Sequence, residues 1–361
     1  MIPQAAPYRR IARFRSELDN AIATVLSGTE YILGSALKAF EQAFASYTGL
    51  DHCVGVASGT DALALALRAA GVRPGDEVIT TAMTFTATAQ AILHCGAIPR
   101  FVDVDHATRC IDPAAVLAAI SSRTTALVPV HLFGYPADMP ALLAISERLG
   151  LVVIEDCAQA HGGTRNGRKL GTYGHAAAYS FYPTKNLGCI GDGGAVVTND
   201  PSLADRVRSL RNYGFQGSVR VSQAIGFNSR LDEIQAAILI VLLGHLDAGN
   251  VERRAIAARY RLMLQDSNIG LPPDDPGCVY HQYAITCQDR DRLARHLAKA
   301  GVGSAVHYAC GLHRHPAFSS GAIEALPVTD ALSRTLLSLP IQPEIADQNV
   351  EQISAAIRGL T

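Results

Sequence analysis

The chain has 361 residues, 48% of them hydrophobic, and its formal net charge is −1 at pH 7. This length exceeds one typical domain, so we expect two domains, or one large and one small, around a sizeable buried core. The nearly balanced charge argues against binding of nucleic acid through the whole surface, and we expect no nucleic-acid partner.

Eight cysteines are scattered along the chain without a C-x-x-C pair, so we expect no metal site. Cys53 and Cys157 stand in apolar, strand-like runs that are typical of buried free thiols. The first residues lack the apolar stretch of a secretory signal, and no apolar stretch reaches membrane-spanning length without a charged or turn residue. We therefore expect a protein of the reducing cytoplasm without a membrane partner.

The first two-thirds of the chain alternates helical and strand-like patterns. Two helices are expected first, over Arg15–Leu26 and Leu37–Tyr47. Short apolar runs then predict strands, and helical patterns fall between them. The predicted strands cover 52–57, 99–105, 125–130, 151–156, 176–181 and 194–198, and the segment 73–80 supplies a turn and a further strand. The helical segments between them cover 58–71, 86–97, 113–120 and 140–150.

This alternation indicates βαβ units and an α/β fold with a mainly parallel sheet. The loop between the last two predicted strands is too short for a helical crossover, so we expect at least one antiparallel member. From about Leu231 a long helical pattern leads into a smaller α/β unit that includes 279–286, 291–301, 304–309 and 331–338. We predict a large domain over 1–245 and a small C-terminal domain over 246–361.

A Ser-Gly-Thr turn, SGTDAL over Ser58–Leu63, lies between a predicted strand and a predicted helix. Backbone N–H groups, two hydroxyls and the positive end of the helix together suit a phosphate group. The alternative is a plain capping turn in which Ser58 or Thr60 is the N-cap residue.

The segment LVVIEDCAQAHGG places Asp156 at the end of an apolar strand, at the edge where open α/β sheets bind ligands. A carboxylate there is costly unless it meets a cation or hydrogen-bond donors. A pyridinium N–H meets this need, and Asp156 would hold that ring nitrogen protonated. The alternative is an acidic N-cap of the next helix. Gln159 either reaches the oxygen of such a ring or is a polar filler.

The four lysines of the chain are Lys38, Lys169, Lys185 and Lys299 among 31 lysine and arginine residues, and Lys185 stands in YSFYPTKNLG, between a strand and a run of glycines. A lysine amine, unlike a guanidinium, can lose its proton and attack a carbonyl. Lys185 suits a Schiff base with a cofactor aldehyde, followed by proton transfer between substrate and cofactor. We expect the hydroxyl of Ser180, five residues before Lys185, to lie near the lysine and toward the phosphate. The alternative is an ordinary solvated loop lysine.

Phosphate turn, aspartate and lysine follow one another on successive strand ends, and further motifs surround them. The chain thereby resembles the DegT/DnrJ/EryC1/StrS family of pyridoxal-phosphate (PLP) sugar aminotransferases over almost its whole length. The matching motifs are EYILG, SGTDAL, GDEVIT, MTFTATAQAI, FVDVD, PVHLFGYPADM, VIEDCAQAHGG, SFYPTKNLG, GDGGAVVT, LRNYG, NSRLDEIQAAIL and LSLP.

The resemblance implies a fold-type-I aminotransferase with a seven-stranded, mainly parallel mixed sheet, and a homodimer with active sites at the subunit interface. Lys185 and Asp156 match the catalytic pair, namely the Schiff-base lysine and the partner of the pyridinium nitrogen. The other matches bind the cofactor: they are Gly59, Thr60 and Ser180 at the phosphate, Phe85 stacked on the ring, Gln159 at the ring or its oxygen, and Asn228 at the partner subunit's phosphate. Without the resemblance, Phe85 reads as an ordinary core residue.

The family implies L-glutamate as amino donor and a nucleotide-linked keto-sugar as acceptor. YPTKNLG followed by GDGGA is most similar to the branch that aminates C-3 of dTDP-3-keto-6-deoxyhexoses. The alternatives are amination at C-4, a UDP- or GDP-linked sugar, and, more distantly, a PLP-binding sensor without turnover. Ala309 and Gly311 stand where relatives commonly have prolines, so the loop beside the sugar is expected to differ in shape. His307 and His313 are retained, as structural residues or as substrate contacts.

Overall fold

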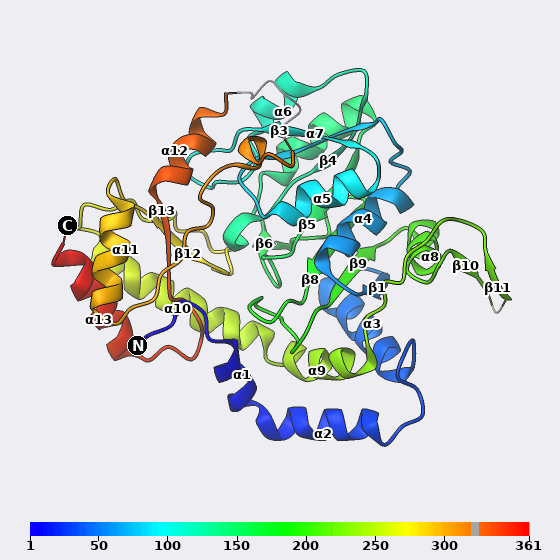
Figure 1. The fold of residues 1–361 in the computed structure, drawn as a ribbon, viewed down its shortest axis with the longest axis horizontal. Helices are drawn as coiled ribbons and strands as arrows, with labels where there is room; N and C mark the ends of the chain where they lie inside the picture. The colour runs from blue at the N-terminus through cyan, green and yellow to red at the C-terminus, as the bar shows by residue number, and fades with distance from the viewer. Residues whose placement is uncertain (218, 319–324, 361) are drawn as a thin grey trace.

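The computed structural model describes residues 1–217, 219–318 and 325–360 (Figure 1). Its centre is a seven-stranded sheet with the order β1-β9-β8-β5-β4-β2-β3. These strands are β1 (His52–Val56), β2 (Glu77–Thr81), β3 (Ile98–Val102), β4 (Thr124–Val128), β5 (Val152–Asp156), β8 (Ala176–Ser180) and β9 (Gly194–Thr198). β9 pairs antiparallel with both β1 and β8, and the other neighbours pair in parallel. The predicted mixed, mainly parallel sheet is confirmed, as is its antiparallel member.

Both faces of the sheet are covered, which explains why its strands are short and almost continuously apolar. Val54, Ile154 and Val196 face one cluster, which includes the buried side of α4 (Gly59–Ala69) and of α8 (Pro201–Leu210). Tyr179 and Val197 face the other cluster. Helices α3 (Ser35–Thr48) and α9 (Glu233–Leu243) close that second cluster, and α2 (Arg15–Leu26) packs against α9.

The remaining elements connect and surround the sheet. They are α1 (Pro7–Arg13), α5 (Thr86–His94), α6 (Pro113–Ala119), the 3₁₀ turn η1 (Leu132–Gly134), α7 (Met139–Leu149), the hairpin β6 (Thr164–Arg165) and β7 (Arg168–Lys169), and the hairpin β10 (Phe215–Gln216) and β11 (Val219–Ser222). The β10–β11 hairpin projects from the body of the molecule beside α8 (Figure 1).

The long helical pattern that begins near Leu231 is broken at Gly244 and His245 into α9 and α10 (Leu246–Leu264), which are bent by 60°. After α10 the chain forms β12 (Tyr283–Thr286), α11 (Arg290–Lys299), η2 (Leu312–Arg314), α12 (Pro327–Thr335), β13 (Leu336–Leu339) and α13 (Asp347–Arg358). Strands β12 and β13 pair antiparallel.

The N-terminal strand-like residues lie against this C-terminal part, since Ile2 forms a parallel bridge with Val302. The division into domains 1–245 and 246–361 stays a prediction. In the part of the chain that the structure describes, no single helix is long and apolar enough to cross a membrane, and α9 and α10 pass that test only as a bent pair.

Candidate active site

A pocket opens at the edge of the sheet where β5 and β8 end and α4 and α5 begin. Seven of the eight residues predicted to hold the cofactor line it: Gly59, Thr60, Phe85, Asp156, Gln159, Ser180 and Lys185. The structure therefore brings together residues that are as far as 126 positions apart in the sequence, from Gly59 to Lys185. This edge is where an open α/β sheet gathers side chains for a ligand.

Lys185 lies in the turn that follows β8, where its backbone N–H donates to the carbonyl of Tyr182 at 2.8 Å. The side chain is half-buried, and for its amine the described residues supply no hydrogen bond or ion pair. Removal from water lowers the pKa of Lys185 to about 8, against a smaller opposing effect of the Asp156 charge. Lys185 is thus an amine held at a pocket wall rather than an ordinary solvated lysine.

Asp156 ends β5 and is 4% exposed. One carboxylate oxygen accepts the N–H of Ala158 at 3.1 Å, and the other accepts the hydroxyl of Thr88 at 2.9 Å. Burial nevertheless raises the pKa of Asp156, because these donors and the more distant Lys185 compensate only in part. The chain continues in turns and no helix begins here, so the interpretation as a helix N-cap is wrong.

The Ser-Gly-Thr turn forms the N-terminus of α4. Ser58 is its N-cap, and its hydroxyl accepts the N–H of Asp61 at 3.1 Å, so the capping interpretation holds for Ser58. The N–H groups of Gly59 and Thr60 stand in the first turn, where an α-helix supplies no partner of its own. A Cβ at Gly59 would lie 2.5 Å from the Cβ of Ser180, so only glycine allows α4 to begin this close to β8.

Phe85 precedes α5 and is 54% exposed, so it is not the core residue that its type alone suggests. Its ring lies 6.2 Å from that of Tyr308, which also lines the pocket. Gln159 is 6% exposed and anchored, since its side-chain oxygen accepts the N–H of Phe133 at 2.6 Å. Its amide nitrogen donates to the Tyr308 hydroxyl at 3.2 Å. The ring and the amide thus face the same space from two sides.

Asn228 is the predicted residue that does not line this pocket. It is exposed and forms an isolated bridge with Asn212 after the β10–β11 hairpin. An outward-facing asparagine is compatible with a role in a second subunit, and that role stays a prediction.

Sequence reasoning missed several side chains of the pocket. Thr88 is the hydroxyl donor to Asp156, and its place three residues after Phe85 in the helical segment was the available signal. Tyr308, His281 and Gln282 come from the C-terminal part of the chain and carry no local signal for this pocket. His307, which the sequence left open as a structural residue or a substrate contact, also lines the pocket, with its Nδ1 2.9 Å from the Ser338 hydroxyl.

Packing explains why the loop around Ala309 and Gly311 departs from the family pattern at Gly311. A Cβ at Gly311 would lie 2.5 Å from Cγ2 of Thr329 and 2.7 Å from the ring of His313, so a proline would not fit there. His313 is buried beside Asp330, 3.4 Å from its carboxylate, and does not line the pocket. We assign His313 a structural role.

His131, Glu155 and Cys157 form a buried group whose ligand atoms lie within 4.8 Å of one another. Nδ1 of His131 accepts the N–H of Ala137, so Nε2 carries the proton and donates to Glu155 at 2.9 Å. The Glu155 carboxylate also accepts the backbone N–H groups of Gly171, Tyr173 and Gly174. His131 and Glu155 are thus engaged with each other and with backbone N–H groups, as in a structural hydrogen-bond network.

The residues of the pocket fit a phosphorylated pyridine aldehyde in charge and in functional groups. Asp156 is a buried carboxylate whose charged form needs a cationic partner, and a ring N–H⁺ is one. The two first-turn N–H groups of α4 suit a phosphate dianion. Lys185 offers an amine that is readily deprotonated. Each of the three chemical groups of such a cofactor therefore meets a matching group of this chain.

Comparison with known proteins points to the same chemistry. The sequence model of the DegT/DnrJ/EryC1/StrS aminotransferase family matches residues 13–358. The chain is 47% identical over 353 residues to the dTDP-3-amino-3,4,6-trideoxy-alpha-D-glucose transaminase of Streptomyces venezuelae, a match that covers 95% of this chain and 92% of that protein.

A second relative and a solved structure are similarly close. The chain is 45% identical over 350 residues to the erythromycin biosynthesis sensory transduction protein EryC1 of Saccharopolyspora erythraea, covering 96% of this chain and 95% of that one. Among solved structures, that of S. venezuelae DesV in complex with a ketimine intermediate superposes with a TM-score of 0.96 at 44% identity, covering 99% of this chain and 98% of the other.

Proposed function

Because the chain belongs to the DegT/DnrJ/EryC1/StrS aminotransferase family, we propose that it moves the amino group of L-glutamate to C-3 of a dTDP-3-keto-6-deoxyhexose. The coarser statements stand without the proposal: the protein is a PLP-dependent transaminase that acts on nucleotide-linked sugars. The observation that supports the transaminase chemistry is the meeting of Lys185, Asp156 and the α4 N-terminus around one pocket.

When bound, PLP supplies an aldehyde that takes up amines and a ring that accepts the electrons freed when a C–H bond breaks. The protein has to hold the ring, keep its nitrogen protonated and move one proton. Asp156 would pair with the ring nitrogen and stabilise its positive charge. Gly59, Thr60 and Ser180, which line the pocket, would hold the phosphate, and Phe85 and Gln159 would bind the ring.

Lys185 is the group that moves the proton. Its pKa of about 8 leaves both the neutral and the protonated amine populated near neutral pH. In the first half-reaction the neutral amine would accept the proton from the α-carbon of glutamate and deliver it to the carbon of the former cofactor aldehyde. In the second half-reaction Lys185 would take a proton from that carbon and deliver it to the carbon of the sugar that is aminated. Because the two half-reactions move the proton in opposite directions, Lys185 alone can serve as base and acid in both.

The position of amination and the nucleotide belong to the proposal. The S. venezuelae relative is named for a dTDP-linked 3-amino sugar, and the GDGGA segment after Lys185 is most similar to the C-3 branch. The test is to load the purified protein with PLP and L-glutamate and to compare three acceptors at equal concentration. A dTDP-3-keto-6-deoxyhexose should yield 2-oxoglutarate and an amino sugar fastest. A faster reaction with a dTDP-4-keto sugar or a UDP-linked 3-keto sugar would contradict the proposed acceptor and identify that sugar as the better substrate.

A sensor without turnover is the second candidate, because one relative is named a sensory transduction protein. Lys185 and Asp156 are both present and line one pocket, which supports the enzyme. The two candidates differ in one observation. A sensor would bind PLP without producing 2-oxoglutarate from L-glutamate, whereas the enzyme converts glutamate in a single turnover even without a sugar.

We also propose a homodimer in which Asn228 reaches the phosphate in the partner subunit. This proposal is motivated by the position of Asn228, which is exposed and does not line the pocket of its own subunit. Subunit complementation tests this: Lys185→Ala and Asn228→Ala chains are unfolded and refolded together. If Asn228 acts across the interface, about a quarter of all sites combine an intact Lys185 with an intact Asn228. Activity that stays at the level of the separate variants would place Asn228 in its own subunit or outside the site.

The cellular location that we propose is the cytoplasm. All eight cysteines are free, and six of them are buried. Free thiols are typical of a reducing compartment. Fractionation of cells that express the protein at native level tests this, and recovery in an oxidising compartment would contradict it.

A further inference from the structure

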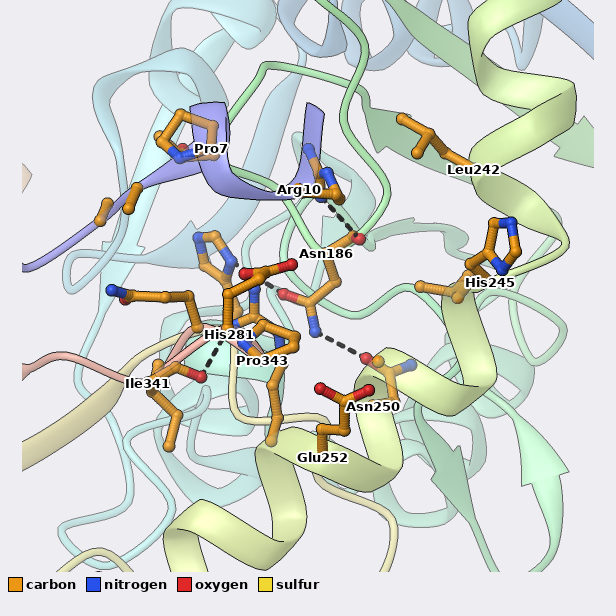
Figure 2. Close-up of a pocket in the computed structure, with 18 of the residues that line it drawn as sticks. Pro7, Arg10, Asn186, Leu242, His245, Asn250, Glu252, His281, Ile341 and Pro343 are labelled. Atoms are coloured by element: carbon orange, nitrogen blue, oxygen red, sulfur yellow. Dashed lines mark hydrogen bonds between the residues drawn. The ribbon is translucent and has the colours of Figure 1, made fainter. Parts of the chain in front are cut away.

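A pocket on the other side of the lysine turn is lined by the first residues of the chain, the start of α10 and the segment before α13 (Figure 2). Arg10 of α1 lies in it, with its guanidinium directed to the backbone that carries Lys185. Nη1 donates to the carbonyls of Lys185 and Asn186 at 2.8 and 3.0 Å. Nη2 donates to those of Pro183 and Gly188 at 2.8 and 3.0 Å.

These four bonds join residues that are 173 to 178 positions apart in the sequence. They engage carbonyls on both sides of Lys185, so the planar fork of one guanidinium fixes the curvature of the turn. A lysine cannot make the same set, because its donors diverge from a single nitrogen. Each bond has a charged donor and is therefore stronger than a bond between neutral groups.

The residue after the lysine is held from the opposite direction. The side-chain amide of Asn186 donates to Oδ1 of Asn250 at 2.9 Å and to the carbonyl of Val279 at 3.0 Å. Its Oδ1 lies 3.1 Å from Nδ1 of His281. Figure 2 shows Asn186 between Arg10 and Asn250. Arg10 and Asn250, neither of which lines the cofactor pocket, thus fix the turn from its far side.

The Lys185 side chain has no such support, since its amine has no hydrogen-bond partner among the described residues. Its position relative to Asp156 therefore depends on the backbone from which it extends. Displacement of a reacting group by about 1 Å can cost about a hundredfold in rate. A residue that fixes this backbone acts on the reaction without touching substrate or cofactor.

We propose that Arg10 is a positioning residue for Lys185, acting through its four hydrogen bonds to the lysine turn. This role rests on the proposed function of Lys185. It makes the first helix of the chain part of the catalytic machinery, although no atom of Arg10 lines the pocket that holds Lys185 and Asp156.

Arg13 offers a matched control from the same helix. Its guanidinium pairs with Glu252 at 3.0 Å, and its side chain is 45% exposed. Arg13→Gln removes the same charge from α1 but leaves every bond to the lysine turn in place. Arg10→Lys keeps the charge at position 10 and removes the fork.

The first readout is hydrogen exchange of the cofactor-free protein. The N–H groups of Lys185 and Cys189 bond to the carbonyls of Tyr182 and Phe181, both at 2.8 Å, and report on the turn. In Arg10→Gln we expect their exchange to rise about tenfold or more, with peptides of α4 and β5 unchanged. Arg13→Gln should exchange like the wild type. Unchanged exchange at Lys185 and Cys189 in Arg10→Gln, or an equal rise over the whole chain, overturns the proposal.

The second readout is the single-turnover reaction of the PLP-loaded protein with L-glutamate. We expect Arg10→Gln to lower the rate constant about 10- to 100-fold with little change in the half-saturating glutamate concentration. Arg10→Lys should recover only part of the rate, and full recovery would overturn the role of the fork. Faster exchange in Arg10→Gln combined with no reaction of the wild type with glutamate would refute the proposed function and leave the contact of Arg10 with the turn supported.

Discussion

The exchange of Asp156 for asparagine separates the charge of this side chain from its shape. Asparagine has nearly the same volume, and its Oδ1 can still accept the N–H of Ala158, which lies 3.1 Å from the carboxylate. The new amide nitrogen can donate to Thr88, whose hydroxyl now donates at 2.9 Å. Thr88 then directs its own proton to the hydroxyl of Thr84 at 3.2 Å, where either oxygen can be the donor. The local hydrogen bonds therefore survive the substitution.

The stability of the cofactor-free protein should not fall. Burial raises the pKa of Asp156, so its charged form opposes folding above that pKa and its neutral form does not. The neutral asparagine removes this unfavourable charge at pH 7. We expect a Tm of Asp156→Asn that equals or exceeds that of the wild type.

The reaction should respond very differently. A charge pair at about 4 Å is worth about 4 kcal/mol at an effective dielectric constant of about 20, and removal of one such stabilising group typically costs about 10²- to 10³-fold in rate. We expect the single-turnover rate constant with L-glutamate to fall by this factor, measured by rapid mixing. The Kd for PLP should change much less, because the phosphate and Lys185 contacts remain. A rate within about threefold of wild type, or a loss that excess PLP restores, would refute the reasoning.

Three further predictions follow from the same pocket. Lys185→Ala should lower turnover at least about 10³-fold while the circular dichroism spectrum and Tm are retained, and activity near that of the wild type would remove Lys185 from the mechanism. In the cofactor-free protein, acylation of Lys185 should increase with pH around a midpoint of about 8, because burial disfavours the ammonium form. Asp156→Asn should move that midpoint to lower pH, because the carboxylate favours the ammonium form. A midpoint near 10.5 would contradict the burial argument. Gly59→Ala should weaken PLP binding by about 1–3 kcal/mol in a spectroscopic titration, because its Cβ would lie 2.5 Å from that of Ser180; Gly249→Ala in α10, whose Cβ would meet Pro343 at 3.7 Å, is the control that should bind PLP normally.

The sheet was readable from the sequence because its strands are buried on both faces. Short, mostly apolar runs between turn residues predict buried strands, as in HCVGV, VVIED and GAVVT. The pattern from Leu231 onward was harder, because α9 is apolar on all sides and no periodicity marks where it ends. The bend before α10 follows from packing against both parts of the chain, which a local pattern does not record.

Some residues in and around the pocket were likewise predictable from the sequence, and others were not. Asp156 and Gly59 were found because the strand before each one predicts a place at the sheet edge. Tyr308 and Arg10 were not, since each acts through contacts with residues more than a hundred positions away. A basic segment such as YRRIARFR predicts an exposed helix face, and only the folded chain shows which of its arginines turns inward.

The choice of lysine at position 185 can be judged against Lys169, which is also held by the protein. The Lys169 amine lies 3.4 Å from the centre of the Tyr47 ring and bonds to the Tyr47 carbonyl, so its charge is used and arginine could serve there. The Lys185 amine has no such partner among the described residues, and its burial lowers its pKa. Arginine keeps its charge at any physiological pH and could neither accept the proton from glutamate nor attack an aldehyde. An amine whose two protonation states are close in free energy can do both, and the turn that Arg10 holds decides where it does so.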